Sequence, residues 1–110
     1  MPMKIPESVR IGGVEYAIEE VEVARIGPNL CYGTIDYTGS TIELSTMDDA
    51  SQQHKCITLW HEILHGLFEH ACVHPEDEEE IVDVLGKGVY QVLQDNAGRL
   101  FDLVVTDDAP

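Results

Sequence analysis

Hydrophobic positions recur with period 2 in the first half of the chain and with a helical period in the second half. Between Val14 and Ile18, apolar residues alternate with polar or small ones, as in a strand that buries one face. Gly12-Gly13 separates this segment from the largely apolar residues 9–11. Two glycines between two such segments predict a hairpin with a two-residue turn.

Residues 31–36 and 41–44 predict a second hairpin, because both segments contain β-branched or aromatic residues and a turn sequence separates them. Residues 27–29, Gly-Pro-Asn, predict a loop before it. The two hairpins together predict a small, mainly antiparallel sheet over about residues 9–45.

Two helices are predicted in the second half. In the first, over about residues 49–72, apolar residues recur at intervals of three and four, and Ser51 can cap the start. The second covers about residues 75–97. Pro75 suits its first position, and the acids after Pro75 suit the positive end of the helix dipole.

Gly86 and Gly88 lie inside the second predicted helix, where they predict close approach to another helix. After it, residues 100–105 predict a short strand and residues 106–110 a frayed tail. These elements predict a single α+β domain, residues 1–110, in which the sheet packs on the first helix and the second helix lies behind.

The composition is that of one globular domain. Of the 110 residues, 44% are hydrophobic and 25% charged, a balance that allows one modest core. No apolar run approaches the roughly 18 residues of a membrane span. The start of the chain lacks the apolar core of a signal peptide, and three cysteines without a disulfide-framework spacing indicate a reducing compartment. We therefore expect a cytoplasmic protein that does not enter a membrane.

The chain is strongly acidic, because 6 basic and 21 acidic residues give a net charge of −15. Direct binding to nucleic acid or to anionic membranes is therefore not expected, since both need basic patches. Acids occupy every position from Glu76 to Glu80, as at an exposed helix start. The same acidity leaves open an acidic decoy that imitates DNA and occupies a DNA-binding partner.

The sequence His61-Glu62-Ile63-Leu64-His65 lies inside the first predicted helix. Residues at i and i+4 share one face of a helix, so His61 and His65 can direct ring nitrogens at one ion. Zn²⁺ accepts imidazole ligands and leaves a position for water, from which Glu62 would take a proton as general base. The alternative is an amphipathic helix with two surface histidines.

The third ligand is predicted on the second helix, because ligands on three successive turns of one straight helix do not converge on one ion. Glu79 is the predicted ligand. Asp83 lies four residues later on the same face, where it would hydrogen-bond a ligand imidazole. Glu78 and Glu80 compete with Glu79 for the ligand position.

His70-x-Cys72-x-His74 is an alternative metal-binding segment, since imidazole and thiolate both bind zinc. It crosses the predicted end of the first helix, and no second pair of similar spacing accompanies it. We therefore favour the His61–His65 site.

The segments Thr58–Gly66 and Glu79–Gly86 resemble the zincin metallopeptidases, in particular short gluzincin-like proteins of phages and prophages. The helix pair is also similar to the peptidase domain of the ImmA/IrrE proteins. The resemblance covers roughly residues 34–96. It implies the following roles: zinc ligands His61, His65 and Glu79, general base Glu62, and Asp83 as the residue that orients a histidine.

The resemblance further implies hydrolysis of a peptide or protein substrate by a zinc-activated water, in a bacterial host cytoplasm if a phage encodes the protein. In zincins an edge strand beside the metal pairs with extended substrate, and the resemblance assigns this role to Thr41–Leu44. No obvious transition-state donor follows the second helix. A zinc-stabilised binding protein without turnover is therefore an alternative. The candidate donors are Tyr37, Tyr90, His70 and His74.

Overall fold

The first predicted hairpin is confirmed in the computed structural model, which describes residues 4–100. β1 (Ser8–Ile11) pairs antiparallel with β2 (Val14–Val21), and Gly12-Gly13 forms the two-residue turn between them. The two glycines have φ values of 58° and 83°. A type I′ turn needs positive φ at both central residues, which explains the choice of glycine.

The second predicted hairpin is also present. β5 (Gly33–Asp36) pairs antiparallel with β6 (Thr41–Ser45), and β6 also pairs parallel with β2. The strand order is therefore β1-β2-β6-β5, and the predicted edge strand at 41–44 is wrong because β6 lies inside the sheet. The edge beside the helical motif is β5. Burial on both faces fits this position of β6, since Ile42 and Leu44 on one face have no exposed surface and Ser45 on the other face is 1% exposed.

A short hairpin lies where residues 27–29 predicted only a loop. β3 (Ala24–Ile26) pairs antiparallel with β4 (Asn29–Cys31). The Ser45 hydroxyl joins this hairpin to the main sheet, because it accepts from the first backbone N–H of β3 at 2.7 Å and donates to the last carbonyl of β4. Strands of three residues are too short to show a period in the sequence.

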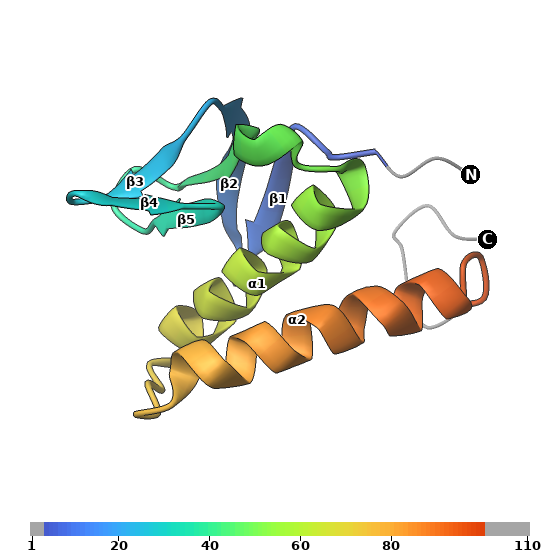
Figure 1. The fold of residues 1–110 in the computed structure, drawn as a ribbon. Helices are drawn as coiled ribbons and strands as arrows, with labels where there is room; N and C mark the ends of the chain where they lie inside the picture. Colours follow the sequence, from blue (N-terminus) through green and yellow to red (C-terminus); the bar gives the residue numbers. More distant parts are fainter. Residues whose placement is uncertain (1–3, 101–110) are drawn as a thin grey trace.

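The first predicted helix is α1 (Gln52–Ala71), which lies across one face of the sheet (Figure 1). Ser51 caps it, since its hydroxyl accepts a hydrogen bond from the backbone N–H of His54 at 3.1 Å. Cys72 ends it in a left-handed conformation with φ of 57°. The buried core between this helix and the sheet consists of Ile11, Tyr16, Ile42, Leu44, Leu59 and Ile63.

The second predicted helix is α2 (Glu78–Asp95), which packs along α1 (Figure 1). It begins three residues later than predicted. Pro75 lies in the turn before it, where its carbonyl accepts a hydrogen bond from the backbone N–H of Glu78 at 3.1 Å. Acidic side chains nevertheless fill the first turn of α2, as its dipole favours. The two helices and the small mixed sheet confirm the α+β prediction.

Gly86 confirms the predicted close approach of the two helices. A Cβ built there would lie 3.2 Å from the backbone nitrogen of His61. At Gly88 the prediction is wrong, because no atom of a neighbouring segment lies within 4 Å of such a Cβ. α2 thus packs closely on the backbone of α1 beside the first histidine of the motif.

Neither helix in residues 4–100 is long and apolar enough to cross a membrane. Apart from Leu100, the strand predicted at 100–105 lies outside the described residues, as does the tail predicted at 106–110.

Candidate metal centre

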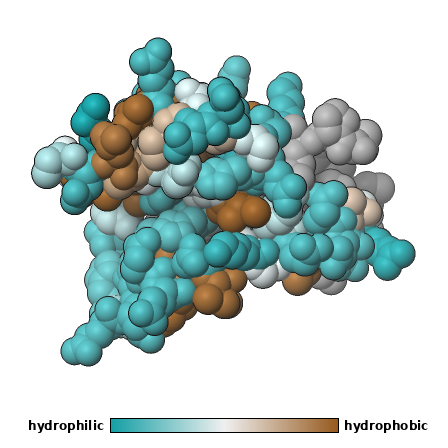
Figure 2. All heavy atoms as spheres, viewed as in Figure 1, coloured by the Kyte–Doolittle hydropathy of each residue, from teal (hydrophilic) through white to brown (hydrophobic). Residues whose placement is uncertain are grey.

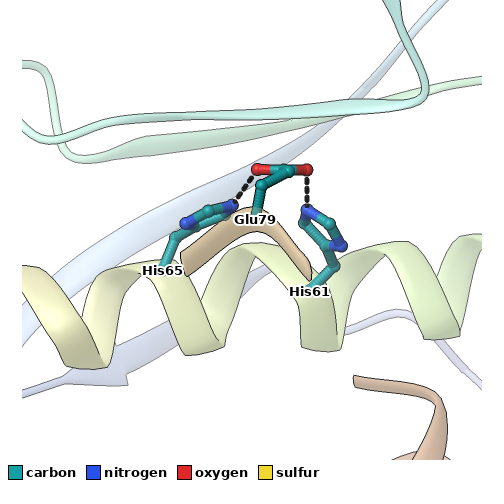
Figure 3. Close-up of side chains that lie close together, drawn as sticks. All are labelled: His61, His65 and Glu79. Atoms are coloured by element: carbon teal, nitrogen blue, oxygen red, sulfur yellow. Dashed lines mark hydrogen bonds and ion pairs between the residues drawn. The ribbon is translucent and has the colours of Figure 1, made fainter. Parts of the chain in front are cut away.

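His61, His65 and Glu79 converge on one point between the two helices (Figure 3). The Nε2 atom of His61 lies 2.9 Å from one carboxylate oxygen of Glu79, and the Nε2 atom of His65 lies 2.9 Å from the other. One atom from each of the three residues lies within 4.8 Å of the other two. Among the described residues, this is the only group of three or more acids, histidines or cysteines with metal-ligand spacing.

The helical spacing of the motif produces the histidine pair. His61 and His65 are four residues apart on α1, and their ring centroids lie 4.9 Å apart. The histidine side chains are 18% and 16% exposed, so both are largely shielded, and both line a cavity. A partly covered, concave position of this kind suits a metal that must also meet a substrate.

Glu79 reaches the histidines because α2 turns back along α1 soon after the motif. Its side chain is 74% exposed, and its two contacts with basic side chains in the described chain are with the two histidines. Of the three acids that competed for the ligand position, Glu79 is the one that meets both Nε2 atoms. Glu78 contacts a different nitrogen of His65, and Glu80 is exposed outside the cluster.

Glu62 is a buried carboxyl group next to this cluster, with only 6% of its surface exposed. Burial raises the pKa of Glu62 to about 7 by disfavouring the charged form, and the nearby Glu79 carboxylate raises it further, while His65 opposes the shift. Gly33 on β5 passes close over it, since a Cβ there would lie 3.2 Å from Oε2 of Glu62. The absence of a side chain at Gly33 thus lets the edge strand approach this carboxyl group.

Asp83 lies beside His61 but makes no hydrogen bond with it. Oδ1 of Asp83 is 3.9 Å from Nδ1 of His61, which is too long for a hydrogen bond. The other Asp83 oxygen accepts a hydrogen bond from Lys87 at 3.2 Å. The position predicted for Asp83 is therefore correct, while the predicted hydrogen bond is absent.

The sequence did not reveal the role of Glu78, which contacts Nδ1 of His65 at 2.6 Å. His74 lies behind Glu78, with its Nδ1 atom 2.9 Å from the second Glu78 oxygen and its Nε2 atom 3.0 Å from Glu69. Helical spacing places Glu78 near this face of α2. Which nitrogen of His65 contacts Glu78 depends on the angle at which α2 crosses α1. Residues close together in the sequence do not determine that angle.

The alternative segment His70-x-Cys72-x-His74 does not form a cluster in the described chain. The His70 ring lies against the β1–β2 turn, where a Cβ at Gly12 would be only 2.2 Å from Nδ1 of His70. His74 is paired with carboxylates, and Cys72 is an exposed free thiol. The three side chains therefore have separate surroundings and do not form one metal site.

A cavity of about 600 Å³ opens beside the cluster and contains all of its functional groups. Its floor carries the motif residues of α1, one wall is β5 with the end of β4, and the opposite wall is the first half of α2. Apolar surface gathers on the β3–β4 hairpin next to this opening, where Ile26 is 61% exposed (Figure 2). The cavity therefore combines a polar cluster with apolar walls, as ligand sites commonly do.

Tyr37, just after β5, also lines this cavity. Burial raises the pKa of Tyr37 to about 12, and the carboxylates of Glu69, Glu78 and Glu62 raise it further. The phenol therefore keeps its proton at neutral pH and can donate a hydrogen bond into the cavity.

The other predicted donors do not line the cavity. Tyr90 is buried beside a separate cavity near Trp60. His70 lies at the β1–β2 turn, and both ring nitrogens of His74 contact carboxylates. Tyr37 is thus the one of the four candidate donors that lines the cavity containing the cluster.

The chemistry of the cluster fits a transition-metal ion. Two imidazole nitrogens and one carboxylate oxygen are the ligands of many catalytic zinc sites. The three donor groups already face one another, so the arrangement requires no rebuilding of the backbone to bring them to one ion. Glu62, buried nearby, adds a carboxyl group that is not needed as a ligand.

Comparisons of the chain with protein-family models, with curated proteins and with solved structures each found no match. The interpretation of this site therefore rests on its residues and their geometry.

Proposed function

We propose that the protein is a zinc-dependent hydrolase that cleaves amide bonds in peptides. The observation that supports this most directly is the convergence of His61, His65 and Glu79 beside the buried carboxyl group of Glu62. Zinc held by these three ligands would lower the pKa of a water molecule and polarise a substrate carbonyl. The two histidine ligands would come from α1 and the glutamate ligand from α2.

Glu62 is the proposed general base. A pKa of about 7 allows the carboxyl group to accept a proton near neutral pH and to return it to a leaving amine. The same ligand set also occurs in non-haem iron(II) sites. A buried carboxyl group that is not a ligand favours hydrolysis, because that reaction needs a base beside the metal.

β5 is the proposed binding site for the substrate backbone. It is an edge of the main sheet, and Gly33, Thr34 and Ile35 all line the cavity that contains the cluster. An extended peptide can add to such an edge through main-chain hydrogen bonds. In this arrangement β5 takes the role that the resemblance assigned to residues 41–44.

Tyr37 is the proposed donor to the substrate carbonyl oxygen. It lines the same cavity, and its raised pKa keeps the phenol protonated. A fixed donor at the position where negative charge develops stabilises the transition state of acyl transfer.

Metal analysis and peptide cleavage test the proposal together. We expect about one zinc per chain in protein purified without chelator or refolded with zinc. A library of extended peptides should be cleaved by wild type and not by Glu62→Gln, although the variant should keep its zinc. Glu80→Gln is the matched control, because Glu80 is exposed on α2 and lies outside the cavity.

Three outcomes would contradict the proposal in different ways. Failure of wild type to bind zinc would remove the metal site. Stoichiometric iron in place of zinc would redirect the chemistry to oxidation. Full zinc occupancy without cleavage of any peptide in the library would favour a zinc-stabilised binding protein.

A further inference from the structure

The two histidines of the cluster differ in what their second ring nitrogen contacts. Nδ1 of His65 lies 2.6 Å from a carboxylate oxygen of Glu78. Nδ1 of His61 lies 3.9 Å from Asp83, beyond hydrogen-bonding distance. His65 is therefore held from both sides in the structure, while the outer nitrogen of His61 is not.

Glu78 is unusually enclosed for an acid at a helix start. Its side chain is 17% exposed, compared with 74% for the neighbouring Glu79. Its two oxygens each contact an imidazole nitrogen, one from His65 and the other from His74. A charged carboxylate is a strong hydrogen-bond acceptor for an imidazole N–H.

His74 and Glu69 extend this contact into a chain of four side chains. Nδ1 of His74 lies 2.9 Å from the Glu78 oxygen that does not meet His65, and Nε2 of His74 lies 3.0 Å from Glu69. Glu69 is in the last turns of α1, His74 is in the connection, and Glu78 opens α2. The chain thus joins the two helices at the point where the cluster is assembled.

We propose that Glu78 is a positioning residue for His65, and that His74 and Glu69 hold Glu78 in place. By accepting a hydrogen bond from Nδ1 of His65, Glu78 leaves Nε2 directed at Glu79 and at the metal position. This inference rests on the proposed metal site. A carboxylate behind a ligand imidazole fixes the orientation of the ring and raises its basicity as a ligand.

The test compares Glu78→Leu, which removes the acceptor, with Glu78→Gln, which keeps an acceptor oxygen without charge. Glu80→Leu is the matched control on the exposed side of the same turn. The first readout is the Nδ1–H proton signal of His65 by NMR, in metal-free and in zinc-loaded protein. The second is zinc affinity, measured by competition with a chromophoric chelator.

We expect a hydrogen-bonded Nδ1–H signal of His65 in wild type and in Glu80→Leu, and its loss in Glu78→Leu. Zinc affinity should fall by about 10- to 100-fold in Glu78→Leu and by less in Glu78→Gln. His74→Ala should weaken zinc binding in the wild-type background and have no further effect in Glu78→Leu, because it acts through Glu78.

Absence of the Nδ1–H signal from wild type would overturn the inference, as would equal zinc affinity of Glu78→Leu and Glu80→Leu. An equal effect of His74→Ala in both backgrounds would overturn the part assigned to His74. If wild type bound no zinc, the proposed function would fail on its own. The signal in metal-free protein would then still decide whether Glu78 orients His65.

Discussion

Gly86 packs directly against the backbone of His61, with the position of a Cβ only 3.2 Å from the His61 nitrogen. This contact lies beside the first histidine of the motif, and Glu79 lies two turns earlier on the same helix. The absence of a side chain at Gly86 thus permits close packing of the helices that carry the three proposed ligands.

Alanine at Gly86 is expected to destabilise the protein despite its better helix propensity. Alanine gains about 1 kcal/mol over glycine in a helix, whereas crowding a packed backbone costs typically about 1–3 kcal/mol. Gly88→Ala is the matched control, since a Cβ at Gly88 meets no neighbouring segment, and it should stabilise by about 0.5–1 kcal/mol. Urea unfolding of the metal-free variants measures both effects. Equal stabilisation by the two alanines would show that the helices separate freely.

Glu79→Gln is expected to weaken zinc binding on the order of 100-fold or more, because loss of a ligand should exceed the loss of its supporting contacts. The change should hardly alter the stability of the metal-free protein, since the Glu79 side chain is 74% exposed. Chelator competition gives the affinity, with Glu80→Gln as the control. Unchanged zinc affinity in Glu79→Gln would leave Glu78 as the ligand to examine next.

Local features of this fold followed from the sequence because each depends on residues close together in the chain. The Gly12-Gly13 turn and the Ser51 cap are examples, as is the helical pairing of His61 with His65. The parallel pairing of β6 with β2 did not follow, because it depends on the path of the chain between the two strands. Long-range placement of this kind leaves no periodic signal.

The contacts of the acids on α2 also divide into those that local spacing predicted and those that depend on the packing of the helices. Helical spacing predicted that Glu79 and Asp83 share the face toward α1, and both line the cavity. The crossing of the two helices decides that Glu78 hydrogen-bonds an imidazole and that Asp83 remains 3.9 Å from one. A shift of one residue along α2 would exchange such roles, so the spacing alone could not assign them.

Tyr37→Phe should lower kcat for peptide cleavage by about 10²- to 10³-fold with little change in KM, as expected for loss of a transition-state donor. Zinc affinity should be unchanged, because Tyr37 is not among the three converging ligands. Tyr32→Phe is the matched control, since Tyr32 also lines the cavity but its hydroxyl donates to Asp48 at 3.1 Å. Wild-type kcat in Tyr37→Phe would exclude the phenol as the donor.

Glu62→Gln is expected to stabilise the metal-free protein at alkaline pH. The Glu62 pKa is about 7 in the folded chain, against an ordinary value of 4.5. Between these values the folded protein binds more protons than the unfolded chain, so stability falls as pH rises from 4.5 through 7. Above pH 7 the ionised, buried carboxylate lowers the free energy of unfolding by about 3 kcal/mol. Glutamine has no charge, so the variant does not lose this stability.

Urea unfolding of both proteins in EDTA, from pH 4 to pH 8.5, measures this difference. The stability of Glu62→Gln relative to wild type should increase as pH rises and level off above pH 7. Glu80→Gln should show no comparable trend, because its side chain is exposed. A difference independent of pH would mean that Glu62 is as easily ionised as a surface acid. A carboxylate that lowers the stability of its own fold does not fit a purely structural role. Such a cost is expected for a proton acceptor at a reactive site.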